Sequence, residues 1–150
     1  MRRQERRKVN DMFKRIKFFI RDKIFNLRVR YQRFKRGWAY SDVWDIDAWF
    51  MDIIKPMLIH LRDHGMGIPM DLYQEGAENE REKWEDVLTE MIYCLNYMEE
   101  DFVLEKLGLY DGDEYKTMTK ENYETVNNIM ENNKNRFFEL FSKHFYSLWD

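Results

Sequence analysis

The sequence predicts an all-α protein, an elongated four-helix bundle with a long basic N-terminal helix. The chain has six glycines and two prolines in 150 residues, too few for the turns of a β-sandwich or barrel. Four segments repeat apolar residues every three or four positions, which places them on one face of a helix. With 44% apolar residues, we expect one helical domain over residues 1–150, made of a basic helix (1–36) and an acidic helical body (37–150).

The first predicted helix covers residues 3–36. We call its apolar face the apolar stripe: Val9, Phe13, Ile16, Ile20, Ile24, Leu27, Tyr31 and Phe34. Three more apolar residues lie off this stripe: Phe18, Phe25 and Val29. Gly37 can adopt the left-handed conformation that ends many helices, and Trp38 beyond it can fold back on the last turn.

The second predicted helix opens at Ser41 or Asp42, both good N-caps, and ends at Gly65. Pro56 cannot donate a backbone hydrogen bond to the preceding turn. A kink near Lys55, or two abutting helices, is therefore expected.

Two more helices complete the predicted bundle. The third covers residues 79–106 with a regular four-three repeat of apolar residues, and Gly108 follows it. The fourth runs from a Thr119 cap to about Leu148. Irregular segments at 66–78 and 109–118 connect the helices.

Charge is divided unevenly along the chain. Fifteen Lys or Arg and three Asp or Glu lie between Arg2 and Arg36, whereas the rest of the chain has ten and twenty-five. The total net charge of −3 hides this division. Blocks of one sign usually mark an interaction surface.

The basic helix has three candidate partners. Its cations could bind phosphates of a nucleic acid or a nucleotide, and the candidates are Arg6, Arg7, Lys14, Lys17 and Arg21. Its amphipathic face could instead lie on an anionic membrane. In the third alternative the apolar stripe packs against protein, in the bundle or on another copy. The long, regular stripe favours protein, then phosphate, with a membrane least favoured.

A second candidate surface, the Trp/Asp corner, covers residues 35–50. Asp42, Asp45, Trp49 and Asp52 are spaced to share one face of the second helix, where carboxylates could hold a divalent cation or a basic partner. Alternatively, the acids are favoured by the helix dipole or pair with the end of the basic helix. The candidate ligand- or partner-binding residues are Arg33, Lys35, Arg36, Trp38, Asp42, Trp44, Asp45, Asp47 and Trp84.

The same stretch carries a sequence pattern, GW-x-x-SD-x-W-x-x-D, then a proline, then W-x-x-x-L-x-x-M. Its residues here are Gly37, Trp38, Ser41, Asp42, Trp44, Asp47, Pro56, Trp84, Leu88 and Met91. The pattern resembles a family of small helical proteins of tailed bacteriophages over about residues 33–95. The resemblance implies a phage-type accessory protein in the host-cell cytoplasm and no particular reaction.

No motif of a known catalytic class is present. The chain lacks a glycine-rich phosphate loop and a G-x-S-x-G elbow. Its single cysteine, Cys94, excludes an internal disulfide, fits a reducing cytoplasm and gives no zinc-binding pair. Residues 111–113 begin like a calcium loop, but Asn122 stands where the loop needs Glu. We therefore expect no catalytic residue, no cofactor and no metal ligand.

These observations favour a non-enzymatic, oligomeric accessory binding protein. It would dock a macromolecular partner or sequester a nucleotide through the basic helix and the Trp/Asp corner. Three alternatives stay open: a nucleic-acid-binding protein, a structural virion component, and a metal-dependent nucleotide hydrolase. The hydrolase would use Asp42, Asp45, Asp52 or Glu90 as metal ligands.

Overall fold

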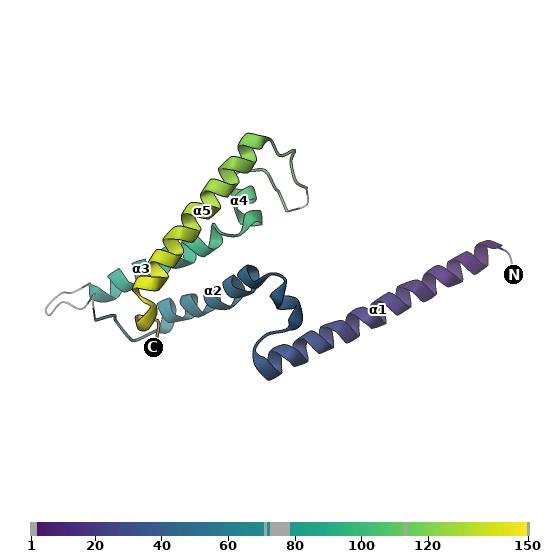
Figure 1. Cartoon of the computed structure of the whole chain (residues 1–150), viewed down its shortest axis with the longest axis horizontal. Coiled ribbons are helices and arrows are strands. Elements are labelled where there is room, and N and C mark those ends of the chain that lie inside the picture. The colour runs from purple at the N-terminus through teal and green to yellow at the C-terminus, as the bar shows by residue number, and fades with distance from the viewer. Residues whose placement is uncertain (1–2, 71, 73–78, 113, 150) are drawn as a thin grey trace. The chain divides into compact units, whose positions relative to one another are not determined.

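The protein is all-α in the computed structural model, which confirms the predicted fold class (Figure 1). The structure describes residues 3–70, 72, 79–112 and 114–149, with side chains of the first helix described from Met12 onward. These residues form five α-helices and two short 3-10 helices, one α-helix more than predicted. The chain divides into two compact units, residues 1–49 and 50–150.

The first unit is built on one long helix. Helix α1 (Arg3–Arg36) has 34 residues and is about 51 Å long at 1.5 Å per residue. It ends as predicted, because Gly37 has φ +81° and donates its N–H to the carbonyl of Arg33 at 2.8 Å. Glycine adopts this left-handed conformation without the steric cost that a Cβ would bring.

The prediction that the second helix opens at Ser41 or Asp42 is wrong. A 3-10 helix, η1 (Tyr40–Val43), takes that place, and α2 (Ile46–His64) begins after it. The Asp42 carboxylate accepts the N–H of Ala39, which precedes it, at 2.8 Å. An α-helical N-cap would instead accept an N–H from two or three residues further on.

Helix α2 continues through Pro56 as one helix, so the alternative of two abutting helices is not observed. Gly65 follows it as predicted. The guanidinium of Arg81 donates to the carbonyl of Gly65 and, at 3.2 Å, to that of Arg62. These bonds satisfy carbonyl groups that the end of a helix leaves without an internal partner.

The predicted third helix is broken in two. Helix α3 (Glu80–Asn96) and helix α4 (Glu100–Lys106) are separated at Tyr97–Glu99. Acidic residues occupy the first turn of α4, where the positive end of a helix dipole favours them. The break therefore lies where the sequence offers a favourable new helix start.

The fourth predicted helix corresponds to α5 (Lys120–Lys143). Its predicted cap is confirmed, since the Thr119 hydroxyl accepts the N–H of Asn122 at 3.1 Å. Its predicted end at Leu148 is wrong, because a second 3-10 helix, η2 (Phe145–Ser147), follows α5. Helix α5 packs along α3 and α4.

Two hydrophobic clusters form the core of the second unit. The larger draws on α2, α3 and α5: Leu58, Trp84, Leu88, Met91, Ile92, Cys94, Leu95, Phe137 and Leu140. The smaller joins α4 to α5: Val103, Leu104 and Val126. Cys94 is buried, and burial raises the pKa of its thiol, with a further contribution from the charge of Glu90.

Candidate functional site

The apolar stripe of α1 is exposed. Its described side chains, Phe13, Ile16, Ile20, Ile24, Leu27, Tyr31 and Phe34, all lie at the surface. Phe13 is 61% exposed and Leu27 is 66% exposed, far more than a packed core face allows. In the described part of the first unit, η1 packs against α1 and contacts its C-terminal end, Gln32 and Arg33. The expectation that the stripe is buried in the bundle is therefore not met within this unit.

Most of the described cations of α1 make no ion pair with another described residue. Among described residues no ion pair is made by Lys14, Arg15, Lys17, Arg21, Lys23, Arg28, Arg30 or Lys35. Two of them lie over neighbouring rings, Arg21 at 5.7 Å from Phe18 and Lys23 at 5.2 Å from Phe19. Arg6 and Arg7 belong to α1, but their side chains lie outside the described residues.

Spacing places three of the phosphate-binding candidates on one face of α1. Lys14, Lys17 and Arg21 are separated by three and four residues, so they project from the same side of the helix. Each is exposed, and none has a described carboxylate as a partner. This face can meet an anion without first breaking an ion pair.

The end of α1 is tied to η1 by one bidentate ion pair. The guanidinium of Arg33 donates to Asp42 from Nε at 3.1 Å and from Nη2 at 2.7 Å. The Asp42 side chain is only 5% exposed and also accepts hydrogen bonds from the N–H of Ala39 and the hydroxyl of Ser41. Asp42 therefore orients a cation of the basic helix, as one of the predicted roles requires.

These hydrogen bonds favour the charged form of Asp42. The bond from Arg33 is the largest influence, the bond from Ala39 is next, and together they lower the pKa of this carboxyl from 3.8 to about 2. Because its pKa is lowered, the charged Asp42 carboxylate stabilises the folded corner at pH values above its ordinary pKa of 3.8. That contribution is lost as the pH falls through about 2.

We expect a carbon-detected NMR titration of the Asp42 carboxyl to show a midpoint near 2. Arg33→Gln removes the main donor, so the midpoint should rise toward 3.8. The matched control is Arg30→Gln, which removes one cation of α1 that makes no bond to Asp42 and should leave the midpoint unchanged. Equal shifts in both variants would show that the general field of α1, rather than this bond, sets the pKa.

Arg36 is held by aromatic rings. Its guanidinium carbon lies 3.9 Å from the ring centroid of Trp38 and 4.1 Å from that of Tyr40. Its Nε donates to the Trp38 carbonyl at 2.9 Å, and Nη2 donates to Gln32 at 3.3 Å. Cation–π contacts of this kind stabilise by about 0.5–1 kcal/mol at exposed sites. Arg36 and Trp38, both predicted to contact a ligand or partner, therefore contact each other within the chain.

The remaining predicted residues divide into two groups. Lys35, Asp45 and Asp47 are exposed and Trp44 is 87% exposed, so all four can meet a partner. Trp84 is 1% exposed in the core of the second unit, where its ring lies 5.4 Å from that of His144. Trp84 is therefore a packing residue, and its inclusion among partner-binding residues is wrong.

The acidic face predicted for the second helix does not form, because Asp42 and Asp45 precede α2. Two of the proposed metal ligands are also engaged elsewhere, Asp42 by Arg33 and Glu90 by Arg136 at 2.7 Å. Within the described ranges, no group of three His, Cys, Asp or Glu is placed to hold a metal ion.

One histidine pair lies outside the predicted set. His60 and His64 are four residues apart on α2, and their rings stack with centroids 4.6 Å apart. The spacing H-x-x-x-H is the sequence signal for two ligands on one helical face. No third ligand completes the pair among the described side chains.

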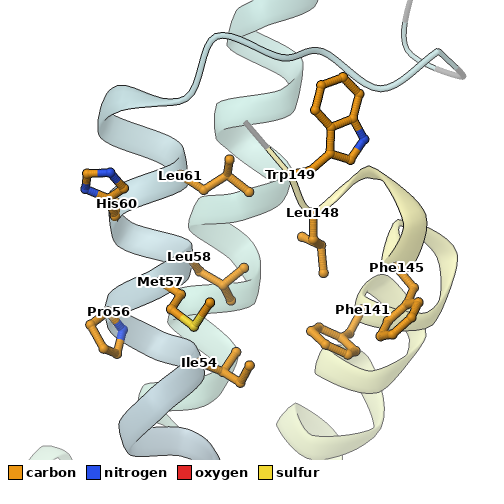
Figure 2. Close-up of a pocket in the computed structure, with 10 residues that line it drawn as sticks. All are labelled: Ile54, Pro56, Met57, Leu58, His60, Leu61, Phe141, Phe145, Leu148 and Trp149. Carbon is orange, nitrogen blue, oxygen red and sulfur yellow. The ribbon is translucent and has the colours of Figure 1, made fainter.

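An apolar hollow of about 580 Å³ lies in the second unit between α2 and the C-terminal segment (Figure 2). Its lining is Ile54, Pro56, Met57, Leu58, His60, Leu61, Phe141, Phe145, Leu148 and Trp149. Figure 2 shows Leu58 and Leu61 directed toward Leu148, with the His60 ring on the other side of α2. Among the described residues that line the hollow, none carries a carboxylate, thiol or hydroxyl group, and the imidazole of His60 is the acid–base group among them.

No helix in the described ranges is long and apolar enough to span a bilayer. Comparisons with protein-family models, curated proteins and solved structures found no match.

Proposed function

We propose that this protein is a non-enzymatic binding protein of phage type, acting in the host-cell cytoplasm. Its helix α1 would dock a macromolecular partner or a surface that bears phosphates, and the Trp/Asp corner would fix the end of that helix. The phage origin and the location follow from the sequence resemblance. The mode of action is supported by one observation, the run of exposed α1 cations that make no ion pair with a described residue.

Acidic side chains of the second unit that pair with cations of the same unit are less available to α1. Several of its acidic side chains pair with cations of the same unit: Arg81–Glu85, Arg136–Glu90 and Lys55–Glu99. In the described part of α1, by contrast, Arg33 is the cation with an ion pair. A basic helix with so few ion pairs inside its own unit can bind a dense external array of negative charge.

The spread of the cations favours a polyanion over a single nucleotide. Lys14 and Arg30 are sixteen residues apart, which is about 24 Å along a helix. A mononucleotide site would need its cations to converge on one point. Cations distributed along a helix instead match phosphates repeated along a chain or a surface.

The direct test uses DNA as a dense polyanion probe. We expect fluorescence anisotropy to show binding of the full chain to duplexes of unrelated sequence at 50 mM salt. With six phosphate contacts, log affinity should fall with log salt at a slope of about −5, which is about a thousandfold loss by 200 mM. Absence of binding at 50 mM, or affinity insensitive to salt, would refute the proposal that α1 cations bind phosphates.

A further inference from the structure

We infer that the phosphate-bearing surface is an anionic phospholipid membrane, with α1 lying in its plane, the apolar stripe inserted and the flanking cations on lipid phosphates. The inference rests on the proposed function, because it needs α1 to bind phosphates. It adds the identity of the partner, which the exposed stripe of α1 indicates.

The first step is the geometry of the stripe. At 3.6 residues per turn, Phe13, Ile16, Ile20, Ile24, Leu27 and Tyr31 fall within an arc of about 80°. All six are exposed, from 46% for Ile16 to 66% for Leu27. An apolar band several turns long and without cover in its own unit is what an interfacial helix presents to lipid.

The second step is the position of the charges. Lys17 and Arg28 lie along one edge of the stripe, and Lys23 and Arg30 lie along the other. None of the four has an ion pair with a described residue. Long cationic side chains at both edges can extend to headgroup phosphates while the stripe between them enters the acyl region.

The third step compares the possible occupants. A nucleic acid would satisfy the cations but would leave the stripe in water, because its phosphate backbone offers no apolar phase. A second copy of α1 would cover the stripe but would bring its own flanking cations against Lys17, Lys23, Arg28 and Arg30, a like-charge contact that helix pairs avoid. An anionic membrane meets both needs together.

The aromatic residues beyond α1 agree with this placement. Trp38, Tyr40 and Trp44 follow α1 within the first unit, and all three are exposed. Trp and Tyr are the side chains that favour the boundary between headgroups and water. On the opposite face of α1, Phe18, Phe25 and Val29 form a shorter apolar group, and Arg21 lies over the Phe18 ring.

The test is flotation of the full-length protein with vesicles. Vesicles of equal parts phosphatidylglycerol and phosphatidylcholine should carry the protein, and vesicles of phosphatidylcholine alone should carry much less. The double variant Ile20→Ser/Leu27→Ser should lose at least about tenfold in partitioning, because it removes apolar area from the stripe. The matched control Phe18→Ser/Phe25→Ser changes the opposite face and should stay close to the wild type. Lys17→Gln/Arg28→Gln should lose about tenfold or more on anionic vesicles.

Circular dichroism with and without vesicles reports whether each variant keeps helix α1. Failure of the wild type to float with anionic vesicles would overturn the inference, as would equal losses in the stripe variant and its control. Stripe-dependent dimers in sedimentation equilibrium, without flotation, would show that a second copy covers the stripe. Retained DNA binding without flotation would overturn the membrane inference alone, whereas absence of DNA binding would remove the proposed function and the membrane inference that rests on it.

Discussion

Phe137→Ala is expected to lower the free energy of unfolding by about 3–5 kcal/mol, measured by urea denaturation followed by circular dichroism. Phe137 is fully buried, and its ring packs between Phe50, at 6.1 Å, and Phe141, at 5.3 Å between centroids. Truncation removes this contact area and leaves a cavity at the junction of α2 and α5. Rings on two helices hold the cavity open, so it cannot close by a local shift.

The matched control is Phe138→Ala. Phe138 is the same residue type at the next position of α5, but it is 46% exposed. Its ring stacks on Phe50 at 6.0 Å and makes an edge contact with Phe137 at 5.2 Å. Its loss should cost about 1 kcal/mol, since much of its surface is already in water. A Phe138 effect equal to that of Phe137 would contradict the assignment of Phe137 to the centre of the core.

Replacing Lys14, Lys17 and Arg21 together by glutamine is expected to weaken DNA binding at 50 mM salt by about a hundredfold or more. Each lost phosphate contact should reduce the salt slope by about 0.9, so a slope of about −5 should become about −2. The three side chains share one face of α1 and carry no described ion pair, so no internal bond is broken by their removal. Anisotropy titrations at several salt concentrations measure both quantities.

A second triple variant separates local from general charge effects. Lys83, Lys116 and Lys143 are exposed residues of the second unit, and their replacement by glutamine changes the net charge by the same amount. The slope should then stay near that of the wild type. Equal losses in the two triple variants would show that DNA responds to total charge, and α1 would not be the binding element.

The long basic helix was the most predictable part of the fold. Its bounds, residues 3–36, follow from the uninterrupted spacing of the apolar stripe and from Gly37, which can take the positive φ that stops a helix. The sequence also predicts Thr119 correctly as the N-cap of helix α5. In both cases the signal is local, because the residue that ends or begins the helix interacts within one turn.

The break between α3 and α4 could not be read from the periodicity. Leu95, Met98 and Phe102 keep spacings of three and four through the break, and neither Gly nor Pro marks it. The start of α2 was missed for a related reason. Asp42 is a good cap by type, but its carboxylate bonds to Arg33 from the preceding helix, a contact that local preference does not reveal.

In the candidate site, too, features set by local sequence could be predicted, whereas those set by tertiary contacts could not. The positions of Lys14, Lys17 and Arg21 on one face follow from spacing alone. Whether the apolar stripe beside them is covered depends on tertiary packing, since periodicity identifies an apolar face but not its partner. Trp84 shows the converse difficulty, because a tryptophan of the sequence pattern was counted among the partner-binding candidates although its spacing matches the buried residues Leu88 and Met91.

The burial of Cys94 makes the native chain suitable for site-directed labelling. It is the single thiol of the protein, it is 2% exposed, and its raised pKa keeps the reactive thiolate scarce at neutral pH. A cysteine introduced at an exposed position of α1 would therefore react with maleimide or nitroxide reagents first, with the natural thiol left in place. Spin labels at successive positions of α1 would then report which side chains enter the acyl region of a membrane and which stay in water.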